Sequence, residues 1–273
     1  MGNGKISLGD RMKCYEGVSN IKLMRRTPVI IRLDGKAFHS FTKGFIKPFD
    51  RNLWKAMTTT TAYLCENIQG CVLGYTQSDE ITLVLCDYQS LDTDAWYDNK
   101  VQKMVSVASS LATFKFNNYF TYLVNNLEQY GDFIEDDSIQ SMTIDEFSTY
   151  LNKLDKASKK GALFDARAFN VPKEEVCNNL IWRQRDAENN SIQSLAQSLY
   201  PHKELQNISV KSLQDKIFTE KGINWNDLPI YQKRGTTVIK DENGNWVIDF
   251  DAPIFSQNRN YVDSRIIFTE VND

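Results

Sequence analysis

The sequence has little of what several common catalytic and metal sites require. Its 273 residues include only two histidines, His39 and His202, so a histidine-rich metal site is excluded. Neither histidine has a neighbourhood that resembles a Ser-His or Cys-His nucleophile motif. The five cysteines contain no C-x-x-C pair, which argues against a thiolate zinc site or a disulfide framework. A bound metal should therefore have carboxylate ligands, which suit magnesium.

Long apolar runs and an excess of positive charge are also missing. No run approaches the roughly 20 apolar residues of a membrane span, and the N-terminus has no apolar signal core. We therefore expect no membrane partner and a cytoplasmic location, with a mitochondrial one left open. The formal net charge of −3 gives no overall attraction to nucleic acid, so a polyanion would need a local basic patch.

The order of apolar and amphipathic segments predicts an α+β fold. Residues 28–170 follow the order strand, helix, strand, strand, helix, strand, which is the split βαβ, or ferredoxin-like, pattern. The Asn-rich and then acidic stretch 117–161 is interpreted as an insertion on the domain surface. Residues 171–273 should add helices and a hairpin with an Asn-Gly turn at 243–244. Residues 1–273 are expected to form one unit.

Three carboxylates stand at the ends of the predicted strands. Asp34 ends the strand in "PVIIRLDG", and Asp79 and Glu80 occupy the turn in "GYTQSDEITLVL". A split βαβ sheet places its first strand beside its third, so it brings these acids together. Their repulsion would be removed by a divalent cation. Taken alone, Asp-Gly after a strand is more often a tight turn and Ser-Asp-Glu is often a polar turn, so both interpretations stay open here.

Three segments carry a resemblance to a known family. "RLDGKAFHSFTKGFIKPFD", "GYTQSDEITLVL" and "WYDNKVQKMVSVASSLATF" closely resemble the tRNA-histidine guanylyltransferase superfamily. The resemblance spans residues 11 to about 205, apart from 117–161, and continues weakly through "LPIYQKRGTTVI". It implies a nucleotidyltransferase that adds nucleotides to the 5′ end of tRNA in the 3′-to-5′ direction, on a polymerase-like palm. It also implies ATP and GTP as substrates and a homotetramer.

The same resemblance implies a two-magnesium catalytic site. Asp34, the backbone carbonyl of Gly35, and Asp79 would hold two Mg²⁺ ions, while Glu80 would support them and share in ligation. Two such ions about 3.5–4 Å apart can clamp the attacking and leaving oxygens of a phosphoryl transfer.

The loop from residue 36 to residue 50 is expected to hold the triphosphate of a nucleotide. The expected nucleotide-binding residues are Lys36, Ala37, Phe38, His39, Lys47, Asp50 and Ser78. Alternatives stay open for several of them. Lys47 is otherwise a solvated lysine, Ser78 a turn residue, and Asp50 also fits the N-cap of the next helix. Phe38 either stacks on a base or fills the core.

Basic and polar residues beyond the palm could supply the local basic patch. The residues expected to contact tRNA or phosphate are Lys100, Lys103, Arg167, Arg183, Arg185, Asn190, Lys233 and Arg234. Phosphate contacts of this kind dominate nucleic-acid affinity. The alternative for each one singly is a solvated charge.

One departure from the family pattern indicates which branch of the family the chain resembles. Eukaryotic members carry "HINNLYNT" after "WRQ.D", whereas this chain reads "ENNSIQSL" and retains only Asn190 of that motif. The histidine position is Glu188 and the tyrosine position is Gln193. The chain therefore resembles the Thg1-like branch, which repairs 5′ ends by template-dependent addition. The alternatives are a tRNA-histidine guanylyltransferase that adds a single G and, from another class, a non-catalytic RNA-binding module.

Overall fold

The computed structural model describes residues 6–90, 92–130 and 137–267. In chain order the elements are α1 (Leu8–Gly17), β1 (Val29–Gly35), α2 (Phe38–Phe41), α3 (Arg51–Asn67), β2 (Cys71–Gln77), β3 (Glu80–Leu85), η1 (Trp96–Asn99), α4 (Val101–Tyr130), α5 (Asp137–Gln140), α6 (Ile144–Lys160), β4 (Phe164–Asn170), α7 (Lys173–Leu199), η3 (His202–Leu205), α8 (Val210–Lys221), η4 (Trp225–Asp227), α9 (Ile230–Arg234), β5 (Thr236–Lys240), β6 (Trp246–Asp249) and α10 (Asn260–Asp263).

A six-stranded sheet forms the centre of the molecule. Its order is β4-β1-β3-β2-β5-β6, and every neighbouring pair is antiparallel. The first four strands have the order that the split βαβ pattern predicts. The predicted C-terminal hairpin is confirmed, since Gly244 adopts φ +80° in the turn between β5 and β6. This hairpin extends the sheet because β5 pairs with β2. The α+β class is therefore confirmed.

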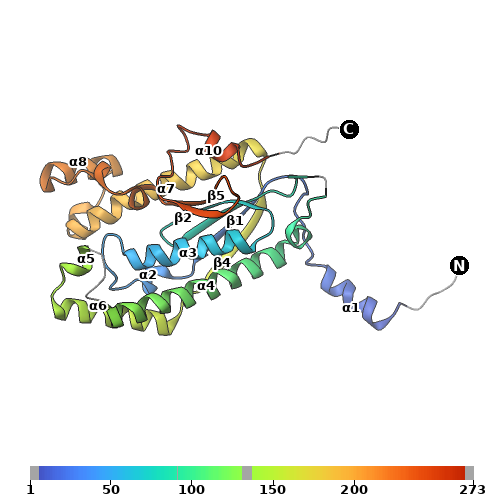
Figure 1. The fold of residues 1–273 in the computed structure, drawn as a ribbon, viewed down its shortest axis with the longest axis horizontal. Coiled ribbons are helices and arrows are strands. Elements are labelled where there is room, and N and C mark those ends of the chain that lie inside the picture. The colour runs from blue at the N-terminus through green and yellow to red at the C-terminus, as the bar shows by residue number, and fades with distance from the viewer. Residues whose placement is uncertain (1–5, 91, 131–136, 268–273) are drawn as a thin grey trace.

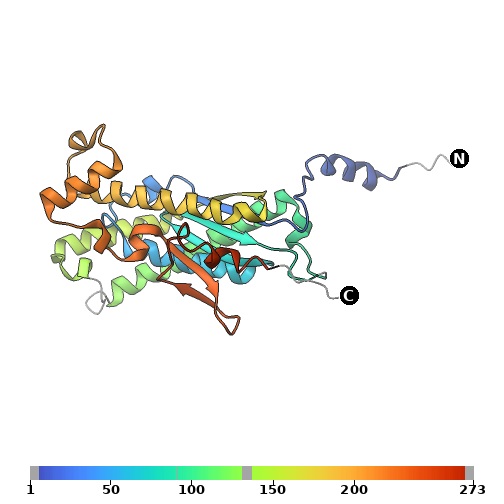
Figure 2. The same ribbon diagram turned by 90° about the horizontal axis from the view of Figure 1, so that it is seen from above.

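Helices cover both faces of the sheet (Figures 1 and 2). Ile31 and Leu33 of β1 pack into the core with α3, α4 and α6, whereas Ile30 packs with α7. Because successive strand residues point to opposite faces, Arg32 and Asp34 lie on the α7 face with Ile30. None of the described helices is apolar over a length sufficient to cross a bilayer.

The interpretation of residues 117–161 as a surface insertion is wrong for the described part of that stretch. Helix α4 continues unbroken past Asn117, and α6 packs back on it. The side chains that this stretch contributes to the core include Phe120, Leu123, Val124, Leu127, Tyr150, Leu154 and Ala157. Apolar residues recur at helical spacing between the polar ones, and the Asn-rich composition concealed that pattern. A capping box of Thr143 and Glu146 begins α6.

Helix α1 projects away from the rest of the molecule (Figures 1 and 2). None of its residues is buried. Large apolar side chains on and next to this helix, among them Tyr15 and Val18, are exposed. The sheet and its covering helices, rather than α1, therefore position the site described next.

Candidate active site

The sheet topology brings three acidic residues to one edge. Asp34 at the end of β1 lies directly opposite Glu80 at the start of β3. Asp79 precedes Glu80, and its carbonyl oxygen accepts a 3.0 Å hydrogen bond from the Gly35 amide. That backbone bond fixes the two strand ends against each other. The arrangement expected from the split βαβ order is therefore present.

Asp34 and Asp79 interact electrostatically. Burial raises the pKa of Asp79, and the nearby charge of Asp34 raises it further. The Ser78 hydroxyl opposes this rise, because it donates to Asp79 Oδ1 at 3.0 Å and so stabilises the carboxylate. The charge of Asp34 thus disfavours the ionisation of Asp79, and a bound cation would remove that repulsion.

Glu80 has a different environment, which the sequence analysis did not foresee. Arg183 of α7 donates to Glu80 Oε2 at 2.9 Å and to Asp186 Oδ2 at 2.7 Å. Burial raises the pKa of Glu80, and the Arg183 guanidinium counteracts that rise. Arg183 is only 5% exposed. Two carboxylates thus pair with the buried Arg183 guanidinium, and its contact with tRNA phosphates stays a prediction.

The acidic edge fits a magnesium ion that arrives with a nucleotide. Within residues 6–90, 92–130 and 137–267, no three histidine, cysteine or acidic side chains are grouped to hold a metal ion. Mg²⁺ usually retains several waters and binds through one or two carboxylates plus substrate phosphates. The carboxylates of Asp34 and Asp79 provide such a partial donor set, and the predicted part of the Gly35 carbonyl stays a prediction. Glu80 as a direct ligand stays a prediction; its Oε1 is buried without a hydrogen-bond partner.

A cavity of about 400 Å³ lies between this edge and the loop that follows β1. Five of the seven residues predicted to bind a nucleotide line this cavity together with Asp79: Phe38, His39, Lys47, Asp50 and Ser78. Lys36 and Ala37 are not among its lining residues. The Lys36 amide is also occupied, since it donates to the Leu163 carbonyl at 2.8 Å. The loop thus encloses a space next to the acids, but the Lys36 amide is not free to bind phosphate as expected.

Phe38 belongs to the core rather than to a stacking surface. Its ring packs against Phe41, Phe116 and Phe164, with centroids 5.0, 5.6 and 5.3 Å away. It also covers Gly35, where an added Cβ would lie 2.7 Å from Phe38 Cγ. Of the two alternatives for Phe38, the structure therefore supports core packing.

Asp50 organises the loop. As the predicted N-cap of α3, its Oδ1 accepts from the Asn52 and Leu53 amides, at 3.0 and 2.9 Å. Its Oδ2 accepts from the Ile46 amide at 3.0 Å and from the Tyr150 hydroxyl of α6 at 2.8 Å. Burial raises the pKa of Asp50, and these four hydrogen bonds lower it. The carboxylate thus joins the loop to both α3 and α6.

Two arginines face each other beside the acids. Arg32 on β1 lies opposite Arg167 on β4, on the sheet face that carries Asp34. Like charges in directly opposed positions are destabilising, and a bound anion would relieve them. Arg32 lies 5.7 Å from the centroid of the Trp182 ring. The sequence analysis missed Arg32, although its two-residue spacing from Asp34 placed it on the same face.

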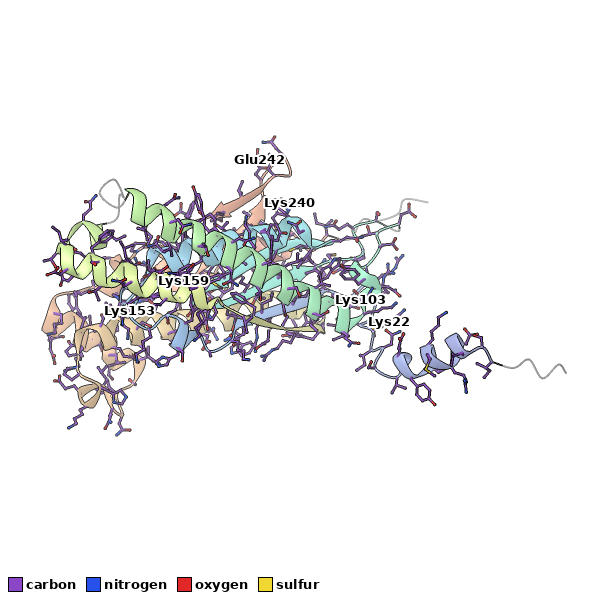
Figure 3. The ribbon with its side chains drawn as sticks, turned by 90° about the horizontal axis from the view of Figure 1, so that it is seen from below. Lys22, Lys103, Lys153, Lys159, Lys240 and Glu242 are labelled. Atoms are coloured by element: carbon purple, nitrogen blue, oxygen red, sulfur yellow. The ribbon has the colours of Figure 1, made fainter. Side chains whose placement is uncertain are left out.

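Lys100 and Lys103 are not part of this site. The backbone around Lys100 pairs with residues 21–23, just before β1, through bonds such as Leu23 N to Asn99 O at 2.9 Å. Asp34 lies at the other end of β1, roughly 20 Å away along the strand. Figure 3 shows Lys103 near Lys22, toward the base of α1. A contact of these lysines with tRNA stays a prediction.

The other basic residues lie around α7 and α9. Lys233 is 8% exposed and donates to the Asn226 carbonyl, and burial lowers its pKa. Burial raises the pKa of Glu188, and Arg234 and Arg185 oppose that rise. Asn190, like Lys233, lines a second cavity. Lys233 is therefore buried rather than a solvated charge, and its contact with phosphate stays a prediction.

Comparison with known proteins gives consistent relatives. Residues 9–172 match the family model described as Thg1, tRNAHis guanylyltransferase. A bacterial tRNA(His) guanylyltransferase (Thg1)-like protein in complex with ATP is 43% identical, with a TM-score of 0.79 over 95% of this chain and 99% of that one. The uncharacterized protein R259 of Acanthamoeba polyphaga mimivirus is 30% identical over 96% of this chain and 88% of that protein. A probable tRNA(His) guanylyltransferase of Drosophila melanogaster is 26% identical; the match covers 78% of this chain and 66% of that protein.

Proposed function

The chain belongs to the tRNA-histidine guanylyltransferase family of nucleotidyltransferases, and on this basis we propose that it repairs tRNA 5′ ends. It adds nucleotides in the 3′-to-5′ direction and selects each one by pairing with the opposite strand of the acceptor stem. One observation carries the proposal: Asp34 and Asp79 converge beside a cavity of about 400 Å³ that the loop after β1 encloses.

Two observations indicate the branch of the family to which the repair activity belongs. The bacterial Thg1-like protein is 43% identical to this chain, whereas the probable tRNA(His) guanylyltransferase of Drosophila melanogaster is 26% identical. The segment "ENNSIQSL" also lacks the histidine and tyrosine of the eukaryotic motif, because Glu188 and Gln193 occupy those positions. Both favour repair over addition of a single G to tRNA-histidine.

The substrates follow from the relatives and the site. Bacterial Thg1-like proteins form complexes with ATP and with GTP, and we propose the same two nucleotides here. The triphosphate lies in the cavity with Lys47 and Ser78. Arg32 and Arg167 face the activated 5′ phosphate of the tRNA and offset its negative charge. The incoming nucleotide's 3′-hydroxyl attacks the phosphorus next to the tRNA 5′ oxygen and loses its proton, and the bond to the activating group breaks: pyrophosphate leaves from a 5′ triphosphate, or AMP from an adenylylated 5′ end.

Each acidic residue has a distinct task. Asp34, Asp79 and the Gly35 carbonyl would hold two Mg²⁺ ions, which when bound promote loss of the hydroxyl proton and neutralise phosphate charge. Ser78 orients Asp79 and stabilises its carboxylate form, while Arg183 stabilises the carboxylate form of Glu80. We also propose a homotetramer, in which a neighbouring copy covers the exposed apolar side chains of α1.

The test uses two substrates and labelled nucleotides with Mg²⁺. One is a tRNA that lacks its first nucleotide, and the other is tRNA-histidine that lacks only its extra G. Template-matched addition to the first supports repair, whereas selective G addition to the second contradicts it. Asp34→Ala should abolish addition; if RNA binding is the whole activity, this variant retains function and the enzymatic proposal fails.

A further inference from the structure

Trp182 of α7 has no part in the proposed reaction, although it lies beside the acidic edge. The Cζ atom of Arg32 is 5.7 Å from the centroid of its ring, and Arg32 precedes Asp34 by two residues on the same face of β1. Trp182 is nevertheless 54% exposed. Tryptophan has one of the largest apolar surfaces to bury, so such exposure next to a candidate active site indicates a binding partner.

The Trp182 ring rests on a rigid support. The Cζ atom of Arg183 lies over the ring, 3.9 Å from its centroid. Arg183 is itself held by Glu80 on β3 at 2.9 Å and by Asp186 on α7 at 2.7 Å. A ring supported in this way is already ordered before a ligand arrives. Binding to it therefore costs little conformational entropy, which favours affinity.

The charges around the Trp182 ring suit a nucleic-acid strand. Arg32 lies directly opposite Arg167 on β4, and Arg32 Nε is buried with no hydrogen-bond partner among the described residues. Arg167 pairs with Asp165 at 3.5 Å, but both side chains are more than half exposed, so this ion pair is weak. Arg185 is exposed and follows Trp182 by three residues, which places the two side by side on α7. Aromatic rings among cationic side chains are typical of surfaces that bind single-stranded nucleic acid.

The proposed reaction limits which base can stack on this ring. The 5′-terminal base pair of the acceptor stem must keep its outer face free, because the incoming nucleotide stacks there while it pairs with the template. The bases of the opposite strand beyond that pair are unpaired. Every unpaired base offers a π-face to an aromatic side chain, whatever its identity. The occupant that fits is therefore the single-stranded 3′ overhang beside the 5′ phosphate.

We propose that Trp182 stacks on an unpaired base of this 3′ overhang and so positions the template strand beside the activated 5′ phosphate. Arg32 and Arg167 contact the 5′ phosphate, and Arg185 contacts the backbone of the overhang. The site favours RNAs with a base-paired 5′ end and a single-stranded 3′ extension, with little dependence on sequence. The inference rests on the proposed function for the nature of the RNA.

Fluorescence anisotropy of the full chain with two labelled hairpin RNAs, in Mg²⁺ and without nucleotides, tests this inference. Both RNAs carry a 5′ phosphate and a 3′ overhang, but in one of them the overhang consists of abasic nucleotides. The wild-type protein should bind the natural overhang about tenfold more tightly, the scale of one base stacked on an aromatic ring. Trp182→Ala should bind the two RNAs equally, because it loses affinity for the natural overhang alone. A variant that is merely misfolded would instead lose affinity for both.

Two further variants serve as controls. Trp182→Phe keeps an aromatic face on the Arg183 support and should retain most of the preference for the natural overhang. Phe114→Ala removes a ring of similar exposure, 58%, from α4 on the other face of the sheet, and should change neither affinity. The natural overhang should also quench the tryptophan fluorescence of the wild type more than that of Trp182→Phe, since only the wild type carries the stacked indole.

Equal affinity of the wild type for the two RNAs, or an undiminished preference in Trp182→Ala, would overturn the inference. Tryptophan fluorescence that changes with protein concentration and not with RNA would also overturn it, because a second copy of the chain would then cover the ring. A protein that prefers the natural overhang but adds no nucleotide keeps the stacking site and refutes the repair activity. Template-matched addition at equal rates by the wild type and Trp182→Ala, with RNA limiting, keeps the proposed function and refutes the stacking site.

Discussion

Asp34 and Glu80 lie directly opposite each other on β1 and β3, yet their carboxylates have different partners. Glu80 pairs with the buried guanidinium of Arg183, which comes from α7. Asp34 instead raises the pKa of Asp79 through its charge, after the larger effect of burial. One acid thus ties α7 to the sheet, and the other two remain available for a cation. This division separates structural from catalytic effects in the predictions below.

Arg183→Met should destabilise the protein by about 3–5 kcal/mol, because it leaves the Glu80 carboxylate buried without a counter-charge. Urea denaturation measures the change. The double variant Glu80→Leu with Arg183→Met should recover most of the loss, since an apolar pair can replace a buried ion pair at little cost. A loss below 1 kcal/mol in the single variant would show that Glu80 is hydrated rather than paired.

Asp79→Asn should reduce nucleotide addition by about two to three orders of magnitude, the scale of a lost metal contact, while leaving the melting temperature of the apoprotein unchanged or higher. The reason is the raised pKa of Asp79. A carboxyl whose pKa is higher in the folded than in the unfolded state stabilises the fold at pH values below the unfolded pKa of about 3.9. This stabilisation is lost as the pH rises through the folded-state pKa. Denaturation between pH 3.5 and neutrality should therefore show a smaller pH-dependent loss in Asp79→Asn than in wild type. Equal profiles, or a large drop in melting temperature, would contradict the proposed repulsion.

The acidic edge was predictable from the sequence because it needs only local motifs and a strand order. "RLDG" and "QSDE" mark two strand ends, and the split βαβ pattern brings them together. The partner of Glu80 was not predictable in this way. Arg183 lies 103 residues further along the chain, so which arginine reaches the sheet depends on how α7 packs. The distance of Lys103 from the acids was also not predictable, because helical spacing says nothing about the end of the sheet at which a helix begins.

The packing of α6 was hidden by composition rather than by distance. Polar and charged residues outnumber apolar ones in the stretch 117–161, and this polarity indicated a surface. Tyr150 and Leu154 nevertheless form one buried stripe of α6, at a spacing of four residues. What the sequence could not indicate is that Tyr150 reaches Asp50 and so connects this helix to the nucleotide loop.

Tyr150→Phe tests that connection. The substitution removes the hydroxyl group that donates to the Asp50 carboxylate. The same hydroxyl accepts a 3.0 Å hydrogen bond from the side-chain amide of Asn52, which would also lose its partner. Leaving these buried groups unpaired should cost about 1–3 kcal/mol of stability and raise the KM for nucleotides. Tyr122→Phe, at an exposed position on α4, is the matched control and should change neither quantity. An unchanged KM in Tyr150→Phe would mean that α6 does not hold the loop in its binding shape.

Gly35→Ala tests how closely the loop packs on the metal edge. The added methyl group would overlap the Phe38 ring, with Cγ at 2.7 Å, and that ring is fixed by Phe41, Phe116 and Phe164. Such overpacking should cost about 1–3 kcal/mol and move the loop that lines the first cavity. We expect lower thermal stability together with weaker tripolyphosphate binding by titration. Gly17→Ala at the end of α1 meets no atom within 4 Å and should leave both unchanged. If Gly35→Ala binds tripolyphosphate as tightly as wild type, the loop is not positioned by the contact between Gly35 and Phe38.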